Sequence, residues 1–274
     1  MRWHTEAIDF PSGDLQLHGV FNIPNGNGPF PGVLMCHGMA SDYRSMRPSA
    51  QQLVRRRIAT LTIDMRGHGK SGGTFDGNIG RDAAAAVEIL KKHDRIDDKR
   101  IAIVGHSIGA LASLYAASAA KDIRAVVLLS LPAEVDGLSL FWNQIRAKAE
   151  RIGYDILEFP RMGPLPYTGW FNQQVSLYWM RFRGYTVRIS SKPDVNSWAA
   201  LDPAKNIKGL NSTPKLFVQC RGDRWLPFDK TLELYEKADQ PKEFMHIEGG
   251  FHVSPLLPGK LRDRWMSWLA SELK

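Results

Sequence analysis

The stretch that decides the fold is Ile103-Val104-Gly105-His106-Ser107-Ile108-Gly109. It places Gly-x-Ser-x-Gly directly after an apolar, β-branched segment and directly before an Ala- and Leu-rich one. This order predicts a strand, a sharp turn at Ser107 and a helix, with the serine hydroxyl exposed beside the first N–H groups of the helix. The two glycines have a steric reason, because strand and helix cross closely at such a turn. A serine held in this way is suited to nucleophilic attack on an acyl group.

The segments around this motif predict a parallel sheet covered by helices on both faces. Strands without polar alternation are separated by helical segments of about ten residues or more, which is typical of such sheets. Two alternating segments, 4–10 and 15–23, come first and predict a hairpin. The predicted strands then cover 32–36, 59–63, 100–104, 123–130, 214–220 and 243–247, and the predicted helices cover 48–57, 81–92, 108–120, 230–238 and 259–273.

The alternation of strands and helices stops between Leu131 and Ala200. This segment holds 12 of the 27 aromatic residues of the 274-residue chain, which is far more than its share of the length. We therefore expect a core domain made of residues 1–130 and 201–274, and a mainly helical, aromatic-rich cap made of residues 131–200. An insertion at this point, after the strand that follows the nucleophile helix, is well placed to cover an active site.

A serine nucleophile needs a base and an acid that orients the base. His252 is the candidate base, because Gly249-Gly250 precede it in a loop between the last strand and the last helix. Asp223 is the candidate acid, because it follows a strand that ends at Cys220 and so lies at the same sheet edge as Ser107. Glu134 and Asp136 are the alternative acids. The order Ser107, Asp223, His252 is the one expected for a nucleophile on this kind of turn.

Acyl transfer also needs donors for the oxyanion, and we expect these to be the backbone N–H groups of Met39 and Ile108. The candidate substrate contacts are four tryptophans and one histidine near these elements, namely His37, Trp142, Trp170, Trp179 and Trp225. Aromatic walls favour an apolar or aryl acyl group. The alternative interpretation is that most of these rings only pack the cap against the core.

The composition excludes several other classes of protein. The net charge is +8, but the basic residues are scattered, and the only run of three, Arg55-Arg56-Arg57, lies at an expected helix end, so no nucleic-acid partner is predicted. No apolar run is long enough to span a membrane, and the N-terminus does not read as a signal peptide. Cys36 and Cys220 are expected to be buried thiols, which fits a cytoplasmic protein. The basic aromatic segment 178–183 would suit a lipid interface, but a membrane surface is not the expected partner.

Taken together, these residues resemble the α/β-hydrolase superfamily. The matching elements are His37-Gly38, the segment Asp64-Met65-Arg66-Gly67-His68-Gly69-Lys70-Ser71, the motif around Ser107, Gly222-Asp223 and His252. Within the superfamily the chain looks most similar to small carboxylesterases of the cinnamoyl or feruloyl esterase type and to serine aminopeptidase-like (S33) hydrolases. The resemblance implies an α/β-hydrolase fold: an eight-stranded, mostly parallel sheet with an antiparallel second strand, helices on both faces and a cap inserted after the sixth strand. It also implies that Arg66 and His68 hold the loop after the fourth strand by hydrogen bonds.

The sequence therefore predicts a serine carboxylesterase that hydrolyses a small-molecule ester through an acyl-enzyme, without metal or organic cofactor. Ser107 argues against relatives with an Asp nucleophile, such as epoxide hydrolases and dehalogenases, and against those with a Cys nucleophile. Two alternatives stay open. One is an aminopeptidase, amidase or thioesterase of the same fold, in which acidic cap residues would bind a free amine; the candidates are Glu134, Asp136, Glu150, Asp155 and Glu158. The other is a weakly catalytic ligand-binding protein. The sequence leaves the oligomeric state open.

Overall fold

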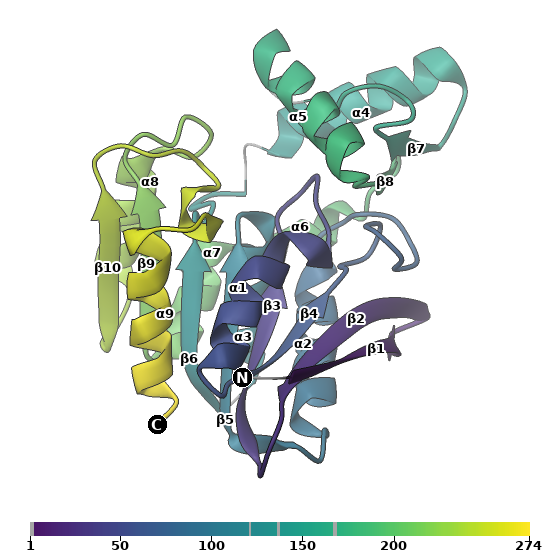
Figure 1. Cartoon of the computed structure of the whole chain (residues 1–274). Coiled ribbons are helices and arrows are strands. Elements are labelled where there is room, and N and C mark those ends of the chain that lie inside the picture. Colours follow the sequence, from purple (N-terminus) through teal and green to yellow (C-terminus); the bar gives the residue numbers. More distant parts are fainter. Residues whose placement is uncertain (1–2, 121, 136–137, 167–168) are drawn as a thin grey trace.

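An eight-stranded sheet forms the centre of the computed structural model, which describes every residue except 1–2, 121, 136–137 and 167–168. Its strands lie in the order β1-β2-β4-β3-β5-β6-β9-β10 (Figure 1). The strands are β1 (Trp3–Ser12), β2 (Leu15–Pro24), β3 (Phe30–Cys36), β4 (Ala59–Ile63), β5 (Ile96–His106), β6 (Ile123–Leu129), β7 (Ile156–Phe159), β8 (Val187–Ser190), β9 (Lys215–Cys220) and β10 (Lys242–Ile247). The helices are α1 (Tyr43–Arg55), α2 (Ile79–Lys91), α3 (Ile108–Ala119), α4 (Leu138–Ile152), α5 (Trp170–Arg183), α6 (Val195–Ala199), α7 (Pro203–Ile207), α8 (Phe228–Lys237) and α9 (Lys260–Glu272), with short 3-10 turns η1 (Lys208–Leu210) and η2 (Ser254–Leu256).

The pairing of the strands confirms the predicted fold class. β1 and β2 form the expected hairpin, and β2 is antiparallel to β4 as well. From β4 onward the neighbours β3, β5, β6, β9 and β10 all run parallel. The sheet is therefore mostly parallel with an antiparallel second strand, and its carboxyl edge carries the ends of β3, β5, β6 and β9.

Both faces of the sheet are buried, which explains why its central strands are apolar throughout. In β3, Val33 and Met35 belong to a core with residues of α1 and α9. Leu34 and Cys36 point to the other face and join residues of α2 and α3. Figure 1 shows α1 and α9 on the near side of the sheet and α2 and α3 behind it. Cys36 and Cys220 are both buried and free, as expected.

The first helix begins earlier than predicted. The sequence pattern predicts this helix over residues 48–57. The helix starts instead at Tyr43, since the Asp42 side chain caps it by accepting the N–H of Arg44 at 2.9 Å. Pro48 therefore lies inside α1 and not at its start.

The segment between β6 and β9 is the insertion into the sheet, and its elements α4, α5, β7 and β8 stand above the carboxyl edge of the sheet in Figure 1. Besides α4, α5 and α6 it contains β7 and β8, a two-stranded antiparallel sheet that the sequence pattern did not predict. Strands of four residues are too short to show a clear alternation of apolar and polar side chains, and for this reason the sequence pattern did not reveal β7 and β8.

Backbone hydrogen bonds attach this segment to the loop that follows β4. Arg188 of β8 donates its N–H to Gly67 O at 2.7 Å, and Phe75 donates to Arg188 O at 2.8 Å. Farther along, Gly77 donates its N–H to Ser197 Oγ at 3.0 Å. The C-terminal part of the segment is thus held to the loop after β4.

The crossing of α3 with the sheet generates a prediction about stability. A Cβ added to Gly109 would lie 2.4 Å from Cys36 O and 2.3 Å from His37 O, so α3 touches the backbone at the end of β3. We expect Gly109→Ala to lower the free energy of unfolding by about 2 kcal/mol or more. The added Cβ would clash with backbone atoms, and the clash can be relieved only if α3 or the end of β3 moves. Urea unfolding of both proteins measures this effect. The matched control is Gly249→Ala, where an added Cβ meets nothing within 4 Å, and an equal loss in the two variants would contradict the prediction.

Candidate active site

Ser107 occupies the turn between β5 and α3 with a strained backbone. Its φ of 56° lies in the left-handed region, which side chains other than glycine rarely adopt. The surrounding backbone holds it there: Ser107 donates its N–H to Leu129 O at 2.9 Å, and its carbonyl accepts the N–H of Ala110 at 2.8 Å. Gly105 leaves room for the turn, because a Cβ at this position would lie 2.2 Å from Gly109 O. The predicted sharp turn at Ser107 is present.

The loop after β3 passes directly beside this turn. A Cβ added to Gly38 would lie 3.2 Å from Ser107 Cβ and 2.9 Å from His106 Nδ1. The loop therefore brings the backbone of Met39 to the neighbourhood of Ser107 and of Ile108 at the start of α3. Within the part of the chain that the structure describes, neither the Met39 nor the Ile108 N–H donates a hydrogen bond.

His252 and Asp223 lie together at the same edge of the sheet. The Nδ1–H of His252 donates to Asp223 Oδ2 at 2.8 Å, and the Asp223 side chain is fully buried. Since Nδ1 carries the hydrogen, the neutral ring keeps Nε2 free to accept a proton. The acid predicted for His252 is thus its hydrogen-bond partner.

The carboxylate of Asp223 is held in its ionised form by a network of donors. Its Oδ1 accepts the backbone N–H groups of Trp225 at 2.8 Å and Leu226 at 3.2 Å. Gln219 Nε2 lies 3.3 Å from Oδ2. Burial raises the pKa of the Asp223 carboxyl, but the bonds from His252, Trp225 and Leu226 more than offset this, so that the pKa lies below its ordinary value.

Two residues that the sequence analysis did not assign hold the main chain of the His252 loop. His106 Nε2 lies 3.0 Å from His252 O, so this nitrogen carries the hydrogen and donates. Ser130 Oγ donates to the same carbonyl at 2.9 Å. The place of His106 directly before Ser107 is the one feature of the sequence that points to this role. Nothing in the sequence pointed to Ser130, because its partner lies 122 residues away.

Among the described residues, no direct hydrogen bond joins Ser107 to His252. The rings of His106 and His252 lie 4.9 Å apart, and Ser107 follows His106 in the chain. Among the residues that the structure describes, no acceptor or donor pairs with the Ser107 hydroxyl. Bonds between nucleophile and base are often long in unliganded enzymes and tighten only when substrate binds.

The prediction that His37 contacts substrate is wrong. The side chain is fully buried beneath the loop that it begins. Its Nε2 accepts the N–H of Met65 at 3.1 Å, so Nδ1 carries the hydrogen and donates to Gly38 O at 2.8 Å. Burial lowers the pKa of His37, which keeps the ring neutral for both bonds. His37 therefore shapes the loop that carries Met39.

The prediction that Trp142 contacts substrate is also wrong. This side chain is buried among other rings, at centroid distances of 6.2 Å from Phe75 and 5.9 Å from Trp198. Phe75 belongs to the loop after β4, whereas Trp142 lies on α4. The ring packs the inserted segment against the core domain, which is the alternative role that the sequence analysis gave to the aromatic residues.

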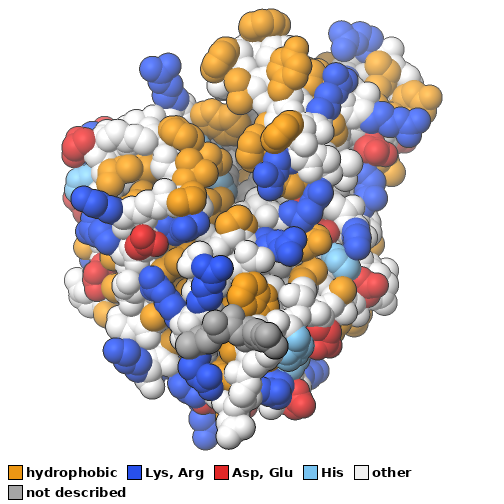
Figure 2. All heavy atoms as spheres, viewed as in Figure 1, with side chains coloured by type: hydrophobic (Ala, Val, Ile, Leu, Met, Phe, Trp, Pro, Cys, Tyr) orange, Lys and Arg blue, Asp and Glu red, His pale blue; other side chains and the backbone are white. Residues whose placement is uncertain are grey.

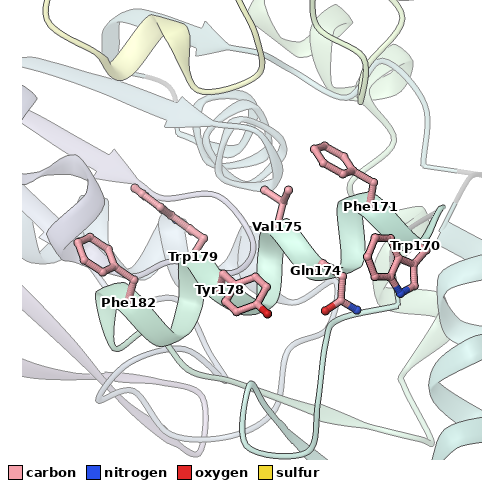
Figure 3. A pocket seen from close by; sticks show the side chains of 7 residues that line it. All are labelled: Trp170, Phe171, Gln174, Val175, Tyr178, Trp179 and Phe182. Carbon is pink, nitrogen blue, oxygen red and sulfur yellow. The ribbon is translucent and has the colours of Figure 1, made fainter.

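The other three tryptophans are accessible. The Trp225 ring stacks on the imidazole of His252 at 5.3 Å with an angle of 17° between the planes, and 40% of Trp225 is exposed. Trp170 and Trp179 lie on α5, along an open groove formed by that helix (Figure 3). Only Trp225 is in contact with a residue of the predicted triad.

The acidic residues of the inserted segment that the structure describes do not line the groove on α5. Glu134 pairs with Lys230 at 3.1 Å, and Asp155 pairs with Lys192 at 2.9 Å. Asp136 lies outside the described residues. Pairing with lysine thus accounts for two of the candidate acids. Elsewhere in the described ranges, no group of three His, Cys, Asp or Glu side chains is arranged to hold a metal ion.

The segment from Asp64 to Ser71 has the structural role that the resemblance implies. Arg66 binds Asp82 through Nε at 2.9 Å and Nη2 at 2.7 Å, and His68 Nδ1 lies 3.0 Å from Arg66 O. Ser71 Oγ donates to Asp64 O at 2.5 Å. These bonds fix the loop after β4, to which β8 is attached.

A family comparison agrees with this fold. The model of the "Alpha/beta hydrolase family" matches residues 33–263, most of the chain. The chain belongs to the alpha/beta hydrolase family. An epoxide hydrolase of Caballeronia sordidicola is 23% identical over 229 residues, which cover 83% of this chain and 60% of that protein.

Two solved structures share the fold at low identity. The alpha/beta hydrolase GrgF from Penicillium sp. sh18 has a TM-score of 0.77 at 19% identity, covering 98% of this chain and 99% of that one. The esterase Pf2001 of Pyrococcus furiosus has a TM-score of 0.67 at 21% identity, covering 99% and 90%.

The environment of His106 predicts a dependence of stability on pH. Burial and the neighbouring His252 lower the pKa of His106 from 6.5 to about 3 in the folded protein. The unfolded chain binds a proton near pH 6.5 and the folded one only near pH 3, so stability is lost as the pH falls through this window. The variant His106→Gln lacks this titrating group. The free energy of unfolding of the variant should therefore change with pH less steeply than that of the wild type, and the difference in slope should be up to about 1.4 kcal/mol per pH unit. Urea unfolding between pH 7 and pH 4 measures both slopes, and equal slopes would contradict the assignment.

Proposed function

We propose that the protein is a serine carboxylesterase in which Ser107, His252 and Asp223 form the catalytic triad. The observation that carries this proposal is the 2.8 Å bond from His252 Nδ1 to the buried carboxylate of Asp223, at the sheet edge that also carries the strained Ser107 turn. That bond leaves His252 Nε2 free as a base. All three groups are of the type and order that hydrolysis through an acyl-enzyme requires.

In the first step, Ser107 Oγ attacks the carbonyl carbon of the ester and its proton moves to His252 Nε2. The negative charge that develops on the carbonyl oxygen is stabilised by the N–H groups of Met39 and Ile108, which are unpaired in the described structure. The Asp223 carboxylate stabilises the imidazolium that forms. His252 then gives its proton to the departing alcohol as the bond from carbon to the alcohol oxygen breaks.

In the second step, a water molecule attacks the acyl-enzyme. His252 takes one proton from the water, and the carboxylic acid leaves as Ser107 recovers its hydrogen. The bonds from His106 and Ser130 to the His252 carbonyl keep the loop in place through both steps. The base can therefore change its protonation state without a change in the position of its main chain.

The identity of the nucleophile supports an ester substrate rather than an epoxide. The epoxide hydrolase relative belongs to a class for which an Asp nucleophile is expected, whereas this chain has Ser107 at the turn. The esterase Pf2001 has the same fold, which is compatible with ester hydrolysis.

We propose that residues 131–200 act as a cap and that the acyl group is apolar or aryl. Trp225 lies against the ring of His252 and offers an exposed aromatic edge to a bound substrate. Trp170 and Trp179 remain candidates for substrate contacts through the groove on α5. The second candidate function is an amidase or thioesterase with the same triad. Recognition of a free amine is less well supported, because Glu134 and Asp155 are paired with lysines.

Replacement of the nucleophile tests the proposal directly. Ser107→Ala should lower kcat by about a thousandfold or more while the thermal unfolding temperature stays close to that of the wild type. A fluorophosphonate probe should label the wild type and not this variant. The matched control is Ser271→Ala, a change in an exposed serine of α9 that should affect neither measurement. Labelling of Ser107→Ala, or turnover near the wild-type value, would refute the triad.

A panel of substrates separates the two catalytic candidates. We expect p-nitrophenyl esters to be hydrolysed with a kcat/KM at least about a hundredfold above that of aminoacyl p-nitroanilides, because no carboxylate lines the groove for a free amine. Esters of aryl acids should be included beside aliphatic esters. Faster cleavage of the anilides would show that the ester assignment is wrong, and labelling without turnover of any member would favour the ligand-binding alternative.

A further inference from the structure

Helix α5 presents a row of large apolar side chains to solvent. Their exposed fractions run from 44% to 83%, and they belong to Trp170, Phe171, Val175, Tyr178, Trp179 and Phe182. Together with Gln174 they line the open groove of Figure 3, in which these side chains project outward from the helix. Only Ser176 and Met180 of this helix are buried. Most helices of a soluble domain bury their apolar side chains, so an exposed apolar face of this size indicates a site of interaction with a partner.

The other large apolar side chains that are exposed among the described residues lie at the same end of the molecule or in the inserted segment. Leu140, Tyr154 and Ile156 belong to that segment. The remaining three, Trp225, Phe251 and Leu257, lie in loops that follow β9 and β10, two of them next to Asp223 and His252. Figure 2 shows apolar side chains gathered over the inserted segment and over these loops. One end of the molecule thus combines apolar surface with the proposed active site.

The charge of this region favours an anionic partner. From residue 159 to residue 192 the sequence contains five basic residues and no acidic residue. Two of them, Arg181 and Arg183, are exposed in the last turn of α5. The guanidinium of Arg183 lies 5.4 Å from the Trp179 ring, so its charge stays beside the apolar face. In a symmetric contact with a second copy the same patch would face these cations, and the described residues that line it offer no carboxylate to pair with them, whereas an anionic surface would complement them.

The kind of side chain indicates a lipid surface. Tryptophan and tyrosine are suited to the boundary between water and hydrocarbon, because their rings are apolar and carry one polar group. A helix with phenylalanine and tryptophan on one face and arginine at its flank matches the pattern of helices that lie in this boundary. Among the described helices, none is long and apolar enough to cross a membrane. Helix α5 would therefore lie on the surface of a bilayer and would not span it.

We propose that α5 binds the surface of a bilayer that contains anionic lipids, through its aromatic face and the cations Arg181 and Arg183. This reverses the expectation from the sequence that a membrane surface is not a partner. The binding does not depend on hydrolysis. Because the loops that carry Trp225 and His252 lie at the same end, docking by α5 brings the proposed triad close to the lipid surface.

Vesicle sedimentation with the full-length chain tests this proposal. The vesicles are made of phosphatidylcholine alone or with about 30 mol% phosphatidylserine, at two salt concentrations. We expect about tenfold or stronger binding to the anionic vesicles, weakened by added salt because exposed charges are screened. The double variant Phe171→Ser/Phe182→Ser should lose binding by about tenfold, which corresponds to about 1.4 kcal/mol. Arg181→Glu/Arg183→Glu should lose binding to anionic vesicles only.

Three controls separate this surface from other causes. Tyr154→Ser removes an aromatic ring that is 59% exposed but lies outside α5, and it should bind like the wild type. Ser107→Ala should also bind normally, so that failure of the proposed catalysis does not affect the outcome. Thermal unfolding of the double variants should match the wild type, since all four changed side chains are exposed.

Three results would overturn the proposal. The first is no binding to either kind of vesicle. The second is equal loss of binding in Tyr154→Ser and Phe171→Ser/Phe182→Ser. The third comes from sedimentation velocity without lipid: a dimer of the wild type that Phe171→Ser/Phe182→Ser abolishes would identify the α5 face as a contact between two copies of the chain.

Discussion

The close approach of α3 to the end of β3 is the constraint on which the rest of the site depends. Gly109 lets the helix backbone touch the carbonyl groups of Cys36 and His37, and Gly105 lets the strand end touch Gly109. With a side chain at either position the two elements would separate. This contact holds Ser107 at a φ of 56° and places the start of α3 next to the loop that carries Met39. Strain at one residue is thus maintained by packing around it.

The second part of the site is a loop anchored at two points. His252 is held through its ring by Asp223 and through its carbonyl by His106 and Ser130. These anchors come from β9, β5 and β6, whose carboxyl ends meet at one edge because the strands are parallel. His106 links the two parts, since it precedes Ser107 in the chain and donates a hydrogen bond to the carbonyl of His252. Substitution of His106 should therefore affect the positions of both Ser107 and His252.

Much of the fold and the pair of His252 and Asp223 followed from local patterns. Uninterrupted apolar strands mark a sheet buried on both faces, and glycines around a serine mark a tight crossing, so these features depend on neighbours in sequence. The substrate contacts were harder to predict. His37 and Trp142 looked available beside the site, but His37 is buried under its own loop and Trp142 packs against Phe75. Whether an aromatic ring is exposed depends on which distant element covers it, and local pattern carries no such information.

Outside residues 131–200, the sequence by itself determined the order of strands and helices, the turn at Ser107 and the places of Asp223 and His252 after their strands. These follow from hydrophobic periodicity and from the steric needs of glycine, which act over a few residues. Only the tertiary structure decided the rest: that Ser130 and His106 share one carbonyl, that β7 and β8 pair, and that the aromatic face of α5 stays uncovered. Each of these depends on segments brought together by the burial of apolar surface elsewhere in the chain, and that burial is a property of the whole fold.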